Sequence, residues 1–160
     1  LAGVLPTIRS RCVSFAVAPV SPADCTRYCA AQGVDKKTAA LYSELFDGHI
    51  GTVLAAARDE GRTAQVEKAL ELARAAAARD SYTAAVLLAA YEKDKAAAAA
   101  LLTDFRAVAA AGLRCSPRAP VQGAQARQAV RLADAALQQL GAQVNPKVVL
   151  SVFAAKLRTL

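Results

Sequence analysis

Apolar side chains recur at helical spacing through most of the chain. Val66, Ala69, Leu70, Ala73 and Ala77 stand three or four residues apart, as they would on one face of a helix. Three later stripes have the same spacing: Ala98, Leu101, Leu102, Phe105, Val108 and Ala109; Ala129, Leu132, Ala133, Ala136, Leu137 and Leu140; and Val149, Val152, Phe153, Leu157 and Leu160. Each stripe is typical of a helix face buried in a core, so the pattern predicts an all-α protein.

The first sixty residues contain signals for short helices. Ser21 stands before a proline at a first helical position, with Asp24 three residues on, and Gly33 supplies a stop. Asp35 can cap a second helix that ends near Gly48. We predict three short helices, over about residues 22–32, 35–48 and 49–60.

The helices after Gly61 are predicted to be longer. Asp80 and Ser81 offer a cap for a helix through Tyr91, and Gly112 can end the helix that carries the Ala98–Ala109 stripe. Prolines 117 and 120 make residues 113–123 the clearest loop. Asn145 and Pro146 then open the last helix. The pattern predicts an antiparallel bundle of about five helices that closes with an antiparallel pair.

The composition of 55% hydrophobic residues reflects alanine, the strongest helix former. No run approaches the roughly 20 apolar residues of a membrane span, so we expect a soluble protein. Arg9 and Arg11 interrupt the apolar stretch that a secretion signal needs, which favours a cytoplasmic location. There is no methionine, so we interpret the chain as a fragment of a longer protein whose native start has been removed.

The four cysteines, Cys12, Cys25, Cys29 and Cys115, form no CxxC pair. A helical domain of this length can bury an adequate core without disulfides, so we favour reduced, half-buried thiols. The alternative is a metal site, because Cys25 and Cys29 stand one helical turn apart and His49 is the single histidine. The spacing alone is a weak signal, and we predict no metal.

Positive charge is concentrated in the last third of the chain. Residues 1–104 hold 12 Lys and Arg against 12 Asp and Glu, whereas residues 105–160 hold 8 against Asp134 alone. Such a segment could meet DNA phosphates or an acidic partner. We favour a solubilising role for Arg114, Arg118, Arg127, Arg131, Lys147, Lys156 and Arg158. The two aromatic residues of the region, Phe105 and Phe153, lie on core stripes, so direct DNA binding is not expected.

Catalytic motifs are not apparent. His49 has no serine or cysteine at a recognisable motif spacing, no glycine-rich phosphate loop is present, and the acids read as solvated charges on polar helix faces. The sequence therefore predicts no independent enzyme and no cofactor bound by these residues.

The opening segment carries a resemblance to a known family. Leu5-Pro6-Thr7-Ile8-Arg9-Ser10-Arg11-Cys12 resembles the arginine-finger segment of bacterial clamp-loader subunits. In these AAA+ proteins the segment closes the ATPase domain, which is followed by a three-helix lid and a helical collar. The resemblance implies that residues 1–20 are the end of a truncated ATPase domain, 21–60 the lid and 61–160 the collar. The family's zinc module lies upstream of these residues and is not implied.

Two further segments refine the resemblance. Residues 48–54 are similar to the start of the family's third lid helix, where ATP-binding members carry an arginine that senses nucleotide, and Gly51 stands at that place. Glycine offers no charge to a phosphate, which implies a subunit that does not hydrolyse ATP. Residues 143–150 resemble the start of the last collar helix in delta prime subunits. Both features favour delta prime over gamma/tau.

The resemblance implies a role in DNA replication, within the DNA polymerase III holoenzyme. Arg11 would act as an arginine finger on ATP and Mg²⁺ bound by a neighbouring subunit, while Ser10 and Cys12 shape the turn; Arg9 could simply be solvated. The collar would assemble with gamma/tau and delta subunits, and the complex would load the sliding clamp onto primer-template DNA. The alternative is a generic helical protein-interaction module with a basic C-terminal surface.

Overall fold

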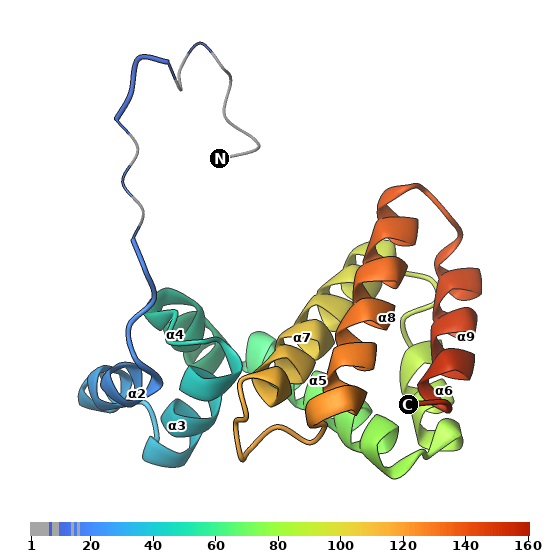
Figure 1. Ribbon diagram of the computed structural model, residues 1–160, viewed down its shortest axis with the longest axis horizontal. Helices are drawn as coiled ribbons and strands as arrows, with labels where there is room; N and C mark the ends of the chain where they lie inside the picture. Colours follow the sequence, from blue (N-terminus) through green and yellow to red (C-terminus); the bar gives the residue numbers. More distant parts are fainter. Residues whose placement is uncertain (1–6, 8–9, 14, 16) are drawn as a thin grey trace.

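The computed structural model describes residues 7, 10–13, 15 and 17–160, and the helical elements of these residues are all α-helices, without a strand (Figure 1). The predicted all-α class is confirmed. Three short helices come first: α2 (Pro22–Ala31), α3 (Lys36–Leu45) and α4 (Ile50–Arg58). Five more follow: α5 (Glu60–Ala78), α6 (Ser81–Ala89), α7 (Lys95–Leu113), α8 (Gly123–Gly141) and α9 (Pro146–Leu157).

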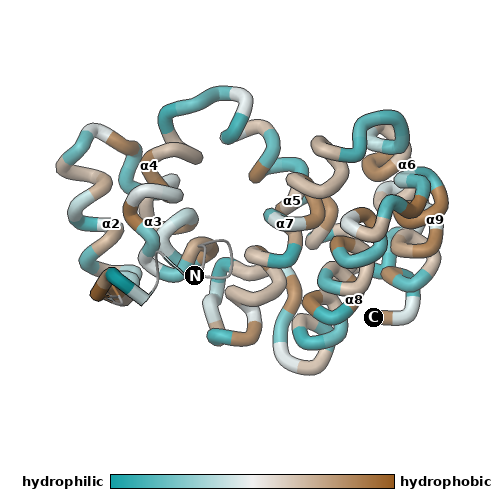
Figure 2. The backbone as a smooth tube through the Cα atoms, turned by 90° about the horizontal axis from the view of Figure 1, so that it is seen from above, coloured by the Kyte–Doolittle hydropathy of each residue, from teal (hydrophilic) through white to brown (hydrophobic). Residues whose placement is uncertain are grey.

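The helices form two neighbouring groups. Helices α2, α3 and α4 pack on one another at one end of the molecule, and we call them the three-helix unit. Helices α5 to α9 form the bundle, in which α7 lies between α5 and α8, while α9 contacts both α8 and α6. The views in Figure 1 and Figure 2 agree that α5 and α7 stand between the three-helix unit and the far helices α6, α8 and α9. The last two helices run antiparallel, as predicted (Figure 1).

The predicted helix starts are confirmed in atomic detail. The side chains of Ser21, Asp35, Asp80 and Asn145 each accept a hydrogen bond from a backbone N–H two or three residues further on. These N–H groups lack a partner inside the helix, so each cap removes an unsatisfied donor. Helix α2 ends before Gly33, which has a φ of +88°, in the left-handed region that favours glycine.

The boundary between the two groups is shorter than the sequence indicated. The third helix was expected to reach Glu60, but α4 ends at Arg58 and α5 begins at Glu60. Asp59 alone separates them, in an extended conformation with φ −101° and ψ 114°, and its carboxylate accepts a hydrogen bond from the N–H of Arg62 at 2.9 Å. A capping acid therefore stops one helix and starts the next within a single residue.

Gly112 does not end its helix, contrary to the prediction. It is buried within the last turn of α7, which continues to Leu113. A Cβ atom at this position would lie 1.9 Å from the carbonyl oxygen of Val121. The glycine therefore allows the loop between α7 and α8 to approach the helix closely, and the chain turns afterwards at Cys115, where φ is +59°.

The buried apolar residues form one continuous cluster through both groups of helices. In the bundle, Phe105 and Phe153 meet edge to face with their ring centroids 5.5 Å apart. Among the described residues, α7 is the one helix long and apolar enough to cross a membrane by length and composition, and half of that stretch is buried inside the protein. Buried helices of protein cores meet the same two criteria.

Candidate functional site

Of the segment that resembles an arginine finger, the structure describes Thr7 and residues 10–12. Ser10 and Arg11 lie in a turn whose side chains are exposed, and the Ser10 hydroxyl donates a hydrogen bond to the carbonyl oxygen of Thr7 at 3.1 Å. Cys12 is exposed and has a free thiol. Arg9 lies outside the described residues. The Arg11 side chain is exposed to solvent.

The segment joins the helices at a tight backbone contact. The carbonyl oxygen of Val20 lies against Gly48, at the turn that opens α4, so closely that a Cβ on Gly48 would stand 1.8 Å from it. Gly48 also has a φ of +72°, in the left-handed region. Both features require glycine at this position. The path of the chain from the opening segment is therefore fixed against the start of α4.

Gly51 occupies the exposed first turn of α4. A Cβ placed there would meet no other atom within 4 Å, so the position has room for a long side chain that it does not have. His49 precedes the helix but does not cap it, because its Nδ1 lies 2.7 Å from the carbonyl oxygen of Phe46. The first turn of α4 consequently presents backbone N–H groups without a capping side chain and without a cation at position 51.

The closing segment is a helix cap and a turn. Gln143 has a φ of +64°, and Asn145 Oδ1 accepts a hydrogen bond from the N–H of Lys147 at 2.9 Å, with Pro146 at the first helical position. These residues stand between α8 and α9 in the bundle, whereas Arg11 and Gly51 belong to the other end of the chain. The structure therefore gives the segments that carry the resemblance separate locations and does not gather them into one pocket.

The cysteines differ from the half-buried state expected for them. Cys25 and Cys29 are fully buried in the three-helix unit with their Sγ atoms 4.0 Å apart, while Cys12 and Cys115 are exposed. Burial, with the neighbouring Cys25, raises the pKa of Cys29 to about 11. His49 is exposed, and its Nδ1 is within hydrogen-bond distance of the carbonyl oxygen of Phe46. Within the described residues no three His, Cys, Asp or Glu side chains gather as metal ligands.

One acid is not the solvated surface charge that the sequence suggested. The Asp104 side chain on α7 is only 3% exposed, and it accepts hydrogen bonds from Arg62 Nη2 at 2.5 Å and from Gln65 Nε2 at 2.7 Å. The pair raises the pKa of Arg62, chiefly through the hydrogen bond to Asp104. Because both partners come from α5, Asp104 links α7 to α5. Both of its carboxylate oxygens accept hydrogen bonds in this contact.

The basic excess of the last third is partly neutralised in space. Arg114 pairs with Asp47, Arg118 with Glu44, and Lys147 with Glu92, and all three acids belong to the first 104 residues. Arg106 pairs with Asp134. Half of the eight basic residues of this region therefore have acidic neighbours. The charge asymmetry along the sequence overstates the asymmetry of the folded surface.

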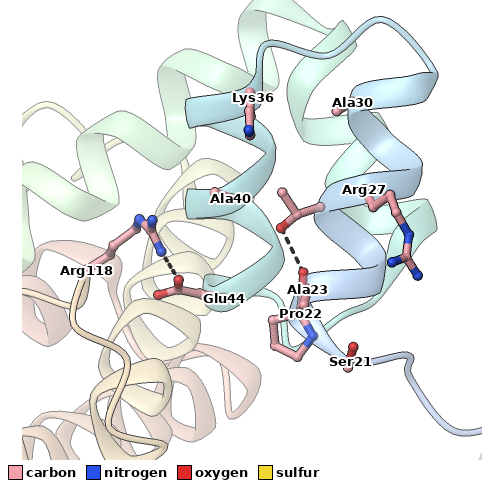
Figure 3. A pocket seen from close by; sticks show the side chains of 10 residues that line it. Ser21, Pro22, Ala23, Arg27, Ala30, Lys36, Ala40, Glu44 and Arg118 are labelled. Atoms are coloured by element: carbon pink, nitrogen blue, oxygen red, sulfur yellow. Dashed lines mark hydrogen bonds and ion pairs between the residues drawn. The ribbon is translucent and has the colours of Figure 1, made fainter.

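A groove that sequence reasoning missed runs between α2 and α3 and is closed on one side by Arg118 (Figure 3). Its volume is about 890 Å³. Small side chains form its walls, among them Ala23, Ala30 and Ala40, and Lys36 also lines it (Figure 3). Glu44 and Arg118 are far apart in sequence, so no local motif could have revealed this groove.

Comparisons of the chain with models of protein families, with curated proteins and with solved structures find no match. The family resemblance consequently depends on the quoted sequence segments, and the geometry described above contributes the helix order and the exposure of the residues concerned.

Proposed function

We propose that this chain is the rear part of a bacterial clamp-loader subunit similar to delta prime. In this proposal the three-helix unit is the AAA+ lid and the bundle is the collar through which subunits assemble. The observation that carries the proposal is the order of parts: a finger-like segment in the sequence, followed over residues 17–160 by three short helices and then five further helices. Assembly, rather than chemistry within these residues, is then the main task of the helices.

The proposed role of Arg11 is to complete the ATP site of a neighbouring subunit. A guanidinium beside the terminal phosphate neutralises charge that develops during phosphoryl transfer, and such fingers accelerate the reaction by about 10³ to 10⁵. The exposure of the Arg11 side chain supports this role, because a finger must reach beyond its own subunit. Ser10 supports it by its hydrogen bond within the turn.

The proposed subunit does not hydrolyse ATP itself. Gly51 lies in the first turn of α4 with open space around it, so this position supplies no cation where the family's ATP-binding members have an arginine. ATP and Mg²⁺ would be held by neighbouring subunits, and primer-template DNA and the sliding clamp would be partners of the whole complex. Arg11 would therefore contribute to catalysis only after assembly.

Replacing Arg11 in the complete clamp loader tests the proposal. Arg11→Ala in the full-length subunit should leave ring assembly unchanged but lower hydrolysis at the neighbouring ATP site by about 10³-fold or more, and the DNA-stimulated ATPase rate by that site's share. Arg11→Lys should not restore the rate, because lysine lacks the planar fork of arginine. Arg127→Ala, an exposed arginine of α8, is the matched control. An unchanged ATPase rate in an assembled Arg11→Ala complex would contradict the assignment.

A second candidate is a helical protein-interaction module unrelated to clamp loaders. It is favoured by apolar side chains exposed on two neighbouring helices of the bundle: Tyr82 and Val86 on α6, which are 79% and 55% exposed, and Val148 and Val152 on α9, which are 55% and 40% exposed. Exposed apolar groups of this kind mark interaction surfaces. The coding sequence upstream of Leu1 separates the candidates: an AAA+ domain there supports the clamp loader, and an unrelated domain supports the module.

A further inference from the structure

The three-helix unit is connected to the bundle by a narrow joint. Along the chain the connection is Asp59 alone, the extended residue between α4 and α5. Across the joint, the Thr63 hydroxyl donates a hydrogen bond to the carbonyl oxygen of Ala56 at 2.7 Å. Sideways, α3 packs against α7. A rotation about Asp59 would separate α3 from α7, so the contacts at that side determine how firmly the two groups are held.

The loop between α7 and α8 supplies polar contacts at the C-terminal end of α3. The Arg114 guanidinium donates hydrogen bonds to the carbonyl oxygens of Glu44 and Leu45, at 3.1 and 3.2 Å, and its Nε lies 3.2 Å from Asp47 Oδ1. The last carbonyls of a helix lack partners inside it and carry partial negative charge, so a guanidinium is well suited to this place. Arg114 therefore binds the backbone of α3 and also the Asp47 side chain in the turn that follows α3.

The same loop also holds the carboxylate of Glu44. The Ser116 hydroxyl donates to one carboxylate oxygen. The Arg118 guanidinium pairs with the other, as Figure 3 shows. The loop is itself braced, because Gln122 Nε2 donates hydrogen bonds to the carbonyl oxygens of Ser116 and Ala119, at 2.7 and 3.0 Å. The Glu44 side chain is only 19% exposed, so solvent screens this pair less than an open surface pair.

We propose that residues 114–118 are a latch that closes on the end of α3 and sets the angle between the three-helix unit and the bundle. Asp59 is the joint about which that angle changes when the latch opens. Three donors from one braced loop, Arg114, Ser116 and Arg118, converge on residues 44–47 from about 70 positions away in the sequence. The proposal concerns the chain's own geometry and holds whether or not the chain belongs to a clamp loader.

The distance between the two groups tests the latch. Spin labels are attached at Tyr28→Cys on α2 and Gln138→Cys on α8, both exposed positions, with the exposed Cys12 and Cys115 changed to serine. Double electron–electron resonance should give one narrow distance distribution for this labelled protein. Glu44→Ala should shift part of the population to a second distance. Glu92→Ala is the matched control, because Glu92 pairs with Lys147 inside the bundle, and its distribution should stay narrow.

A second variant acts from the other side of the contact. The double variant Arg114→Gln and Arg118→Gln removes the latch cations while α3 keeps its own sequence, so it decides the question even if Glu44→Ala fails to fold. Circular dichroism checks that the helices persist in each variant. A second distance in the double variant supports the latch. A distribution identical to that of the unaltered protein in the double variant overturns it.

Discussion

The three-helix unit and the bundle achieve helical structure by different means. Helices α2, α3 and α4 have 9 or 10 residues, whereas three of the five bundle helices, α5, α7 and α8, each have 19; α6 has 9 and α9 has 12. Helices shorter than about 12 to 15 residues are marginal in isolation, so the unit depends on caps, tight turns and mutual packing. The bundle depends on long apolar faces that meet in one core. The comparison teaches that helical content alone does not tell how a region is stabilised.

The two groups contribute differently to the shared apolar core, and the three-helix unit contributes fewer large side chains. The unit buries a small set of side chains, in which Cys25, Cys29 and Ala39 stand beside Tyr42 and Leu45. The bundle buries Phe105, Phe153 and most of its leucines. Fewer buried methylene groups give less hydrophobic stabilisation. We therefore expect backbone amides of the three-helix unit to exchange hydrogen faster than those of α7 and α8, which hydrogen-exchange mass spectrometry can measure.

The largest effect on this comparison is expected from Phe105→Ala. The side chain is fully buried against Phe153, and its removal should lower the free energy of unfolding by about 3–5 kcal/mol. Urea unfolding followed by circular dichroism measures the loss. Tyr82→Ala, at an aromatic residue that is 79% exposed, should change it little. Equal losses for the two variants would show that the bundle does not depend on this core.

An intermediate effect is expected from Gly48→Ala in the three-helix unit. The new Cβ would collide with the Val20 carbonyl in a backbone with positive φ, which should cost about 2 kcal/mol or more. Gly51→Ala, three residues on, has open space and ordinary helical backbone, and should be neutral or stabilise α4 by about 0.5 kcal/mol.

Hydrogen exchange shows where the effect of Gly48→Ala falls. Faster exchange should be confined to α2, α3 and α4 and should leave α8 and α9 unchanged. If Gly48→Ala and Gly51→Ala behaved alike, the contact with Val20 would not constrain the turn.

The smallest effect is expected from acid acting on the cap of α3. The backbone N–H of Thr38 is the main cause that holds the pKa of Asp35 below its ordinary value of 3.8. A pKa lowered in the folded state adds stability that is fully present above about pH 4 and is lost as pH falls through the folded value. The Asp35→Asn side chain can still cap but does not titrate.

The measurement is the difference in urea midpoint between the unaltered protein and Asp35→Asn, taken at pH 5 and again at pH 3. The unaltered protein should have a smaller advantage in urea midpoint at pH 3 than at pH 5. Asp80, whose pKa is lowered chiefly by the hydroxyl of Thr83, provides the corresponding cap in the bundle. The difference in urea midpoint between the unaltered protein and Asp80→Asn should also be smaller at pH 3 than at pH 5. Hydrogen exchange of the backbone amides around Asp80 should change less than that around Asp35. A difference that does not vary with pH would contradict a charged cap.

Local features of the fold could be predicted from the sequence, and distant ones could not. The caps at Ser21, Asp35 and Asn145 were predictable because a cap involves residues two or three positions apart. The role of Gly112 was missed because it depends on Val121, which belongs to the following loop. Stripes of apolar residues identified the helices, but the pattern could not tell that Asp104 turns inward to meet Arg62.

In the candidate site, too, local features could be predicted from the sequence and contacts between distant segments could not. Arg11 and Gly51 could be singled out because each belongs to a short contiguous segment of sequence, and both lie at exposed positions. The contacts of Arg114 and Arg118 with residues of α3 join segments about 70 positions apart. A local sequence motif cannot predict pairs at that separation. The same contacts explain why the charge asymmetry of the sequence is weaker on the folded surface.

The contact between Val20 and Gly48 also defines a tether. Arg11 precedes Val20 by nine residues, and a fully extended chain spans at most about 3.3–3.6 Å per residue, so the Arg11 backbone stays within about 30 Å of this anchor. In the proposed clamp loader, the phosphate that Arg11 serves would lie inside this radius plus the length of one side chain. The turn at Gly48 would then be the centre of a sphere that limits how far the neighbouring subunit stands from this chain.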